Sequence, residues 1–136
     1  MRFLSAAHTD VGTTKKINQD AFCLKIARTP TTNIAFAVMC DGMGGHSMGD
    51  VAAQTVCDAI CIFWEENPDY ADSPQKITEA FKKASDALYA RSCIVRPTEM
   101  GTTPVMASIE GNNITIAHCG DSRCYLLRNG EVIYRT

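Results

Sequence analysis

The chain has 136 residues, of which 46% are hydrophobic and 21% charged, and its formal net charge is −2. This length and composition are typical of one globular domain with a core of its own. The weakly acidic charge offers no basic surface for nucleic acid or an anionic membrane, and no apolar run is long enough for a signal-peptide core or a membrane span.

The first predicted elements are strands. Residues 3–7 predict a weak strand, and residues 21–27 predict a second one. The apolar run 34–40 predicts a third strand. Because this run lacks alternating polar residues, we expect it to be buried on both faces.

Two helices are predicted after the third strand. Residues 47–50 have the form of a capping box, and apolar residues then recur at helical spacing as far as Pro68. Ser73 as an N-cap and Pro74 at the first helical position mark the start of a second helix. This helix should end before Pro97.

The last part of the chain has the period-two pattern of strands from Thr103 onward. Residues 111–112, Gly-Asn, predict the turn of one hairpin. Asn129-Gly130 predicts another, since a type I′ turn needs positive φ at both central residues. These strands should form a meander, and the whole pattern indicates an α+β fold with helices on one face of an antiparallel sheet.

The seven cysteines form an odd number, and most have apolar neighbours in the sequence. A reduced thiol in such surroundings behaves as a small hydrophobic side chain, so we expect reduced cysteines and a cytoplasmic location. Cys57 and Cys61 stand four residues apart and would share one helix face. Without a C-x-x-C pair or clustered histidines, this spacing favours core packing over zinc binding.

A glycine-rich segment, Asp41 to His46, directly follows the predicted strand at 34–40 and reads D-G-M-G-G-H. The acid stands at a strand end and the glycines let the backbone approach a ligand closely, so this segment is a candidate site. A plain strand-to-helix turn with an exposed acid would have the same composition. A dinucleotide-binding loop is a weaker alternative, because its fingerprint is one glycine short and lacks the later acid at a strand end.

Four motifs occur in order along the chain: N-Q-D-A at 18–21, D-G-M-G-G-H at 41–46, G-T-T at 101–103 and G-D-S-R-x-Y-L at 120–126. They resemble the protein phosphatase 2C (PPM) family of metal-dependent serine/threonine phosphatases, and the second motif is similar to its bacterial branch. The resemblance runs from about Asp10 to the last residue, and the later acidic motifs of the family have no counterpart here. It implies that residues 1–136 are the N-terminal part of a single phosphatase domain. The fold implied is a sandwich of stacked antiparallel β-sheets flanked by α-helices, incomplete in this chain.

Two acids are candidate metal ligands. Asp20 and Asp41 each stand near a strand end, so adjacent strands could bring both carboxylates to one place, where Mg²⁺ or Mn²⁺ would relieve their repulsion. The resemblance implies that Asp41 bridges two metal ions, that Asp20 and the Gly42 carbonyl help to hold them, and that Asp121 belongs to a third, weaker metal site. From the residues alone, Asp20 could be an exposed acid and Asp121 a turn former.

Three basic residues are candidates for other roles. Many family members have a phosphate-clamping arginine where this chain has Lys15, and a lysine would attract phosphate without the planar fork that orients it. Lys15 could also be a solvated surface charge. His46 is a candidate proton donor to the leaving alkoxide, or an incidental histidine at a helix start. Arg123 is expected to tie backbone carbonyls together.

The reaction implied by the resemblance is hydrolysis of phosphoserine or phosphothreonine in proteins by a metal-bound hydroxide, in a complete domain. Because the later acidic motifs are missing, we expect this chain alone to be weakly active or inactive. We also expect it to self-associate or to pair with the missing C-terminal half. The alternative is a non-catalytic, truncated phosphatase-like protein with a regulatory or phosphopeptide-binding role.

Overall fold

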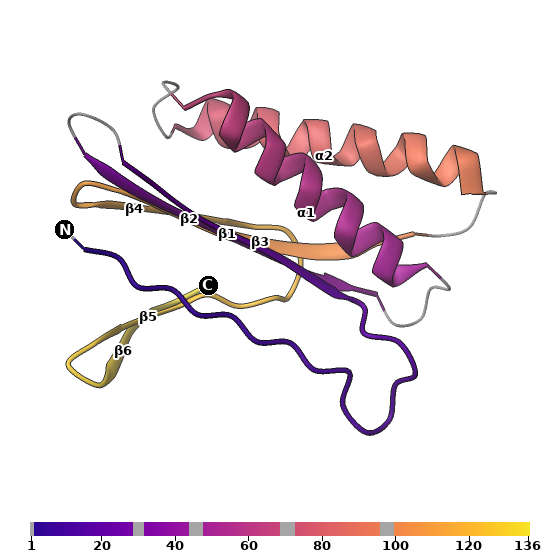
Figure 1. Cartoon of the computed structure of the whole chain (residues 1–136), viewed down its shortest axis with the longest axis horizontal. Coiled ribbons are helices and arrows are strands. Elements are labelled where there is room, and N and C mark those ends of the chain that lie inside the picture. Colours follow the sequence, from indigo (N-terminus) through magenta and orange to yellow (C-terminus); the bar gives the residue numbers. More distant parts are fainter. Residues whose placement is uncertain (1, 29–31, 44–47, 69–72, 96–99) are drawn as a thin grey trace.

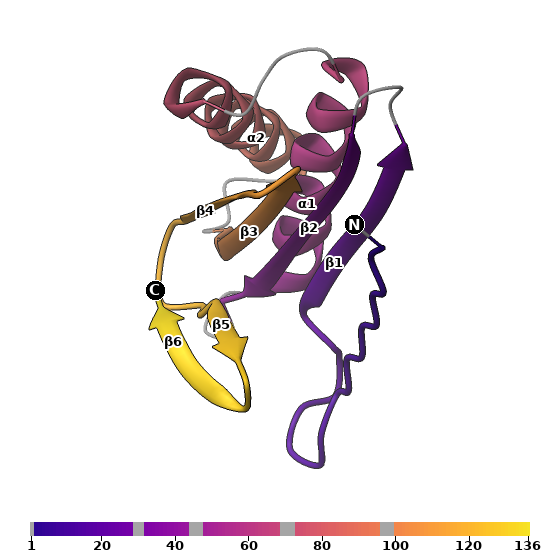
Figure 2. The same cartoon turned by 90° about the vertical axis from the view of Figure 1, so that its left-hand side faces the viewer.

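The computed structural model describes residues 2–28, 32–43, 48–68, 73–95 and 100–136. Two helices, α1 (Gly49–Glu66) and α2 (Pro74–Val95), lie on one face of a four-stranded antiparallel sheet, as Figure 1 shows. The sheet has the order β1 (Asp20–Arg28), β2 (Asn33–Gly42), β3 (Thr102–Glu110) and β4 (Asn113–His118). A separate hairpin of β5 (Tyr125–Arg128) and β6 (Glu131–Arg135) lies on the side away from the helices (Figure 2).

The predicted strands that correspond to β1 to β6 are confirmed, whereas the strand predicted at residues 3–7 is wrong. Asp20 pairs with Asp41 at one end of the β1–β2 ladder, and Arg28 pairs with Asn33 at the other end. Residues 3–7 belong to no strand in the structure, and most of their side chains are exposed. The weak pattern there was not supported by a hydrogen-bonded neighbour, which a strand requires.

Only one face of β2 is fully buried, so the prediction of burial on both faces is wrong. Val38 and Cys40 point toward the helices and are 0% and 1% exposed, whereas Met39 between them is 52% exposed. Side chains alternate across a strand, so the side chain of Met39 lies on the sheet face away from the helices. The helices therefore bury only one face of β2. The apolar run correctly indicated a strand with apolar side chains, but it did not show which face would be buried.

The helix boundaries agree with the sequence, apart from the first cap. The N-cap of α1 is Met48, which makes no side-chain capping bond, while the expected cap Ser47 lies outside the described residues. At the start of α2, Ser73 Oγ accepts the backbone N–H of Lys76 over 3.2 Å, which confirms Ser73 as the N-cap. Among the described residues, neither helix is long and apolar enough to cross a membrane.

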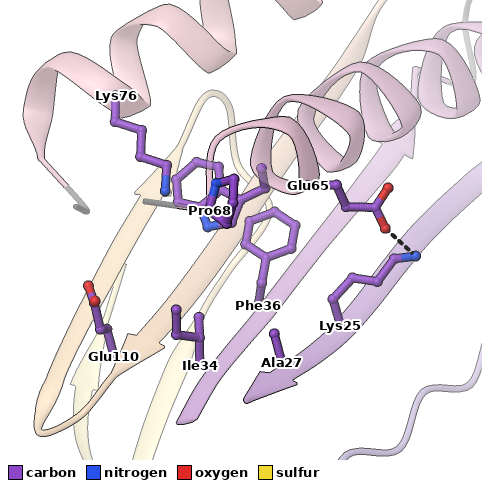
Figure 3. Close-up of a pocket in the computed structure, with 9 residues that line it drawn as sticks. Lys25, Ala27, Ile34, Phe36, Glu65, Pro68, Lys76 and Glu110 are labelled. Carbon is purple, nitrogen blue, oxygen red and sulfur yellow. Dashed lines mark ion pairs between the residues drawn. The ribbon is translucent and has the colours of Figure 1, made fainter. Parts of the chain in front are cut away.

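The core ends in an aromatic cluster where α1 meets the strands. Phe36 of β2 stacks on Trp64 of α1 with ring centroids 4.8 Å apart. Lys76 of α2 is buried, with its ammonium 4.2 Å from the centre of the Trp64 ring. This cluster and the Lys25–Glu65 ion pair line a hollow of about 230 Å³. Figure 3 shows Phe36 and Lys76 of the cluster beside the ion pair. The Trp64 ring and the aliphatic stem of Lys76 make burial of this charge tolerable.

Both predicted hairpins form, but the expected meander does not. Gly111 turns the chain between β3 and β4 with φ of +59°, and Asn129 and Gly130 have the positive φ values of a type I′ turn between β5 and β6. However, β4 and β5 belong to different sheets. Gly120, with φ of +105°, redirects the chain between them.

The cysteines divide into paired and free ones. Cys23 of β1 and Cys61 of α1 form a disulfide with Cα atoms 6.6 Å apart, so the expectation of reduced thiols is wrong for this pair. Tertiary packing brings the two sulfurs together across 38 residues of sequence. Cys40 and Cys57 are free and buried, and the hydrogen bond that the Cys40 thiol donates to Cys57, together with burial, raises the pKa of Cys40. Cys40 therefore remains a neutral core side chain.

Candidate functional site

One end of the four-stranded sheet collects the candidate metal ligands. Asp20 at the start of β1 stands directly opposite Asp41 near the end of β2, and Asp41 stands opposite Thr103 of β3. Their chain neighbours Ala21 and Cys40 are buried on the helix side. Strand alternation therefore places the two carboxylates on the sheet face away from the helices. The sequence prediction that adjacent strands bring Asp20 and Asp41 together is borne out in the geometry.

The pKa of Asp41 shows that negative charge gathers here. Partial burial raises this pKa, and the carboxyl groups of Asp20 and Asp121 raise it further. A hydrogen bond between the Asp41 and Asp20 side chains acts in the same direction, while the positive charge of Lys15 lowers the pKa. Two carboxyl groups in contact are an unfavourable arrangement unless a proton or a cation lies between them.

Gly42 holds this strand end against the first turn of α1. Its N–H donates to the Gln19 carbonyl over 2.9 Å. A Cβ at position 42 would overlap the Gly49 carbonyl and lie 2.6 Å from the Gln19 carbonyl oxygen. The glycine is therefore required by close approach of three backbone segments.

The G-T-T motif ties the site to β3, a role that sequence reasoning did not assign. Thr102 Oγ1 donates to the Asp41 carbonyl over 2.7 Å, and the Gly101 carbonyl accepts the N–H of Met43 over 3.0 Å. Thr103 Oγ1 and Ser122 Oγ lie 2.7 Å apart. Thr102 and Thr103 belong to the G-T-T motif and Ser122 belongs to the G-D-S-R motif. The occurrence of both motifs in order was therefore the sequence signal that could have placed these residues at the site.

Asp121 lies near the pair without joining it. Its charge contributes to the raised pKa of Asp41. Within the described part of the chain, however, no three acidic, thiol or imidazole groups stand close enough to surround one ion. Arg123 donates from Nη1 to the Thr136 carbonyl over 2.7 Å, as expected for a residue that ties down backbone.

The N-terminal segment forms one wall of the site. A hollow of about 100 Å³ opens beside the carboxylates and is lined by Asp10, Val11, Lys15, Ile17, Asn18, Gln19, Asp20, Asp41 and Gly42. Lys15 thus lines the same hollow as the two acids, and its phosphate-binding role stays a prediction. His46 lies outside the described residues, so its candidate role rests on the sequence alone.

The donor atoms fit a hard cation. Asp20 and Asp41 present carboxylate oxygens, and the raised pKa of Asp41 indicates that an added positive charge would be favoured there. Mg²⁺ and Mn²⁺ prefer such oxygen ligands. The residues present therefore fit part of a divalent-metal site.

Comparison with known sequences identifies relatives among bacterial phosphatases. The protein phosphatase 2C family matches residues 8–136. The serine/threonine protein phosphatase PstP of Mycobacterium tuberculosis is 33% identical over 128 residues, which are 93% of this chain and 23% of PstP. The protein phosphatase PhpP of Streptococcus pneumoniae is 30% identical over 127 residues, or 90% of this chain and 50% of PhpP.

Solved structures agree with the sequence comparison. The crystal structure of Mycobacterium tuberculosis PstP superimposes with a TM-score of 0.74 at 33% identity, covering 93% of this chain and 51% of PstP. The PstP catalytic domain in complex with two manganese ions also gives a TM-score of 0.74 and is covered to 52%. The chain thus spans about half of the solved phosphatase chains, in the same arrangement of antiparallel sheet and two helices. With this fold and a family match over nearly its whole length, the chain belongs to the protein phosphatase 2C family.

Proposed function

We propose that residues 1–136 are the N-terminal part of a single metal-dependent phosphatase domain that hydrolyses phosphoserine or phosphothreonine in proteins. The observation that carries this proposal is the placement of Asp20 directly opposite Asp41 on adjacent strands, in one hollow with Lys15. Family membership and the names of the relatives support the same reaction class. Because the chain spans only part of these relatives, the activity is proposed for the complete domain.

In this proposal the carboxylates of Asp20 and Asp41 and the carbonyl of Gly42 hold two Mg²⁺ or Mn²⁺ ions. Asp121 lies farther out and would serve a third ion. Bound metal ions would supply activation of water and positive charge against the phosphoryl oxygens. The manganese-bound PstP structure supports this choice of metal.

Lys15 would attract the substrate phosphate into the hollow beside the acids. Its ammonium is a compact charge on a flexible stem, so it would draw phosphate in without fixing its orientation. His46 is proposed, from the sequence alone, as the proton donor to the leaving serine or threonine oxygen.

A non-catalytic role in regulation or phosphopeptide binding is the second candidate for this chain alone. It is favoured by the ligand count, because no three candidate ligands cluster in the described part of the chain. Each metal ion would then have too few protein ligands, so metal should bind weakly and phosphate release should be slow or absent. Lys15 could still attract a phosphorylated peptide.

The deciding experiment measures phosphate release from a phosphothreonine peptide by the purified chain with and without Mn²⁺. In a longer form that includes any remaining part of the domain, Asp41→Asn should lower turnover by at least about 10²-fold. Asp86→Asn, on the exposed surface of α2, is the matched control and should leave turnover unchanged. Near-normal manganese-dependent hydrolysis by Asp41→Asn would contradict the assignment.

A cytoplasmic location remains a prediction from cysteine usage. The five free cysteines support it, whereas the Cys23–Cys61 disulfide points toward an oxidising compartment. Labelling of free thiols in rapidly quenched cells would decide between the two.

A further inference from the structure

Thr9 joins the N-terminal segment to Asp20, the first of the two contacting acids. Its hydroxyl donates to Asp20 Oδ2 over 3.3 Å and accepts from Asn18 Nδ2 over 2.8 Å. Asn18 Oδ1 in turn accepts the backbone N–H of Asp20 over 3.0 Å. Thr9, Asn18 and Asp20 therefore close a ring of hydrogen bonds at the start of β1, which we call the Thr9 latch.

The Thr9 latch also closes the loop that carries Lys15. Asp10 Oδ1 accepts the N–H of Gly12 over 2.6 Å, and Gly12 has φ of +71°, so the chain turns sharply just after Thr9. The loop returns to Asn18, nine residues along, where the bond to Thr9 joins its two ends. One hydroxyl group thus links the carboxylate of Asp20 to the base of the loop that bears the phosphate-attracting lysine.

We propose that Thr9 is a positioning residue of the metal site, which holds the Asp20 carboxylate in one orientation before a cation binds. The proposal rests on the proposed function, because it assigns Asp20 as a metal ligand. A hydroxyl bonded to one carboxylate oxygen restricts rotation of the group, so less conformational freedom is lost on metal binding. Partners of this kind, one bond away from the metal, typically change metal affinity measurably when they are removed.

The test compares Thr9→Val, which keeps the side-chain shape without the hydroxyl, with Thr9→Ser, which keeps the hydroxyl. Thr13→Val, in the same exposed segment, is the control. Mn²⁺ affinity of the 136-residue chain is measured from paramagnetic broadening of its backbone amide NMR signals, which also detects weak binding. Thr9→Val should bind Mn²⁺ about tenfold more weakly, the lower end of the loss typical when a partner of a metal ligand is removed, while Thr9→Ser and Thr13→Val stay within about twofold of the original chain. Unchanged affinity in Thr9→Val, or an equal loss in Thr13→Val, would overturn the proposal.

A second measurement needs no metal. In the metal-free chain, Thr9→Val should speed hydrogen exchange of the Asp20 amide several-fold, because the ring that holds this amide is opened. The urea midpoint should stay the same, since the latch lies on the surface; a lowered midpoint with unchanged Asp20 exchange would show a merely structural role and overturn the proposal. If residues 1–136 alone bind no Mn²⁺, the affinity comparison is made in a longer form that includes any remaining part of the domain, and absence of Mn²⁺ binding there would contradict the proposed function. The exchange measurement decides in either case whether Thr9 holds Asp20.

Discussion

At the scale of single residues, the charge around Asp41 predicts how stability depends on pH. Burial, Asp20 and Asp121 raise its pKa above the ordinary value of 3.8, so the folded chain holds a proton there more tightly than the unfolded chain. The stability that this gives is fully present below pH 3.8 and is lost as the pH rises through the raised pKa of the folded state. At neutral pH the ionised Asp41 side chain therefore disfavours folding of the metal-free chain relative to its protonated form.

Asp41→Asn should consequently raise the thermal midpoint of the metal-free chain at pH 7, because it removes a charge that Asp20 and Asp121 repel. The difference from the original chain should shrink as the pH is lowered toward 4, where Asp41 itself becomes protonated. Thermal unfolding followed by circular dichroism in the presence of a chelator measures both effects. A lower thermal midpoint for Asp41→Asn at pH 7 would show that repulsion among the carboxylates does not destabilise the folded chain.

Substitution of Lys15 should weaken phosphate binding without weakening metal binding, so it separates the two. Lys15→Ala should weaken binding of a phosphothreonine peptide by roughly tenfold, the scale of one charge-assisted contact at a partly exposed site. Its metal affinity should be unchanged or slightly tighter, because a positive charge beside Asp41 has been removed. Lys16→Ala is the matched control, and calorimetric titration of each ligand measures the outcome. Lost metal binding in Lys15→Ala would count against the phosphate role.

At the scale of elements, the packing at the junction between β2 and α1 predicts that substitution of Gly42 destabilises the chain more than substitution of Gly101. A Cβ at Gly42 would meet the backbone of Gly49 and Gln19, which cannot move without shifting α1 or β1. A Cβ at Gly101 would meet the methyl end of the Met43 side chain, which can rotate away. Gly42→Ala should therefore destabilise the chain by about 1–3 kcal/mol, the cost of overpacking, and Gly101→Ala by clearly less. Urea unfolding compares the two, and a milder effect at Gly42 would contradict the described packing.

At the scale of the whole molecule, the sheet face away from the helices carries an apolar patch made of Phe22, Ile26, Met39 and Ile114, which are 41–52% exposed. Register places all four on this face, over β1, β2 and β4. We propose that the rest of a phosphatase domain packs here, since the chain spans about half of the solved relatives. Exposed apolar surface of this kind favours association.

The purified chain should therefore form dimers or larger species at micromolar concentration. Ile26→Glu should shift the chain toward monomer, because a charge on the patch opposes burial. Ile62→Glu is the control, since Ile62 is 50% exposed on the opposite, helical side, much as Ile26 is on the patch. Sedimentation velocity measures the species present. A compact monomer for the original chain would show that this face is stable in water.

The sequence by itself determined the two helices, the strands from β1 onward and the choice of Asp20 and Asp41 as candidate metal ligands. Ser73-Pro74 marked the start of α2, Asn129-Gly130 marked a hairpin turn, and the four ordered motifs named Asp20 and Asp41. These signals are local, because caps, turns and glycine-rich loops depend on residues a few positions apart.

Only the tertiary structure decided which distant groups meet. It placed the helices on one face of β2, separated β4 from β5, paired Cys23 with Cys61, and closed the Thr9 latch on Asp20. An apolar run shows that a strand is buried but not on which side, and an exposed threonine in an irregular segment gives no sign of its partner. Contacts of this kind depend on how whole elements pack, so the residue pattern alone leaves them open.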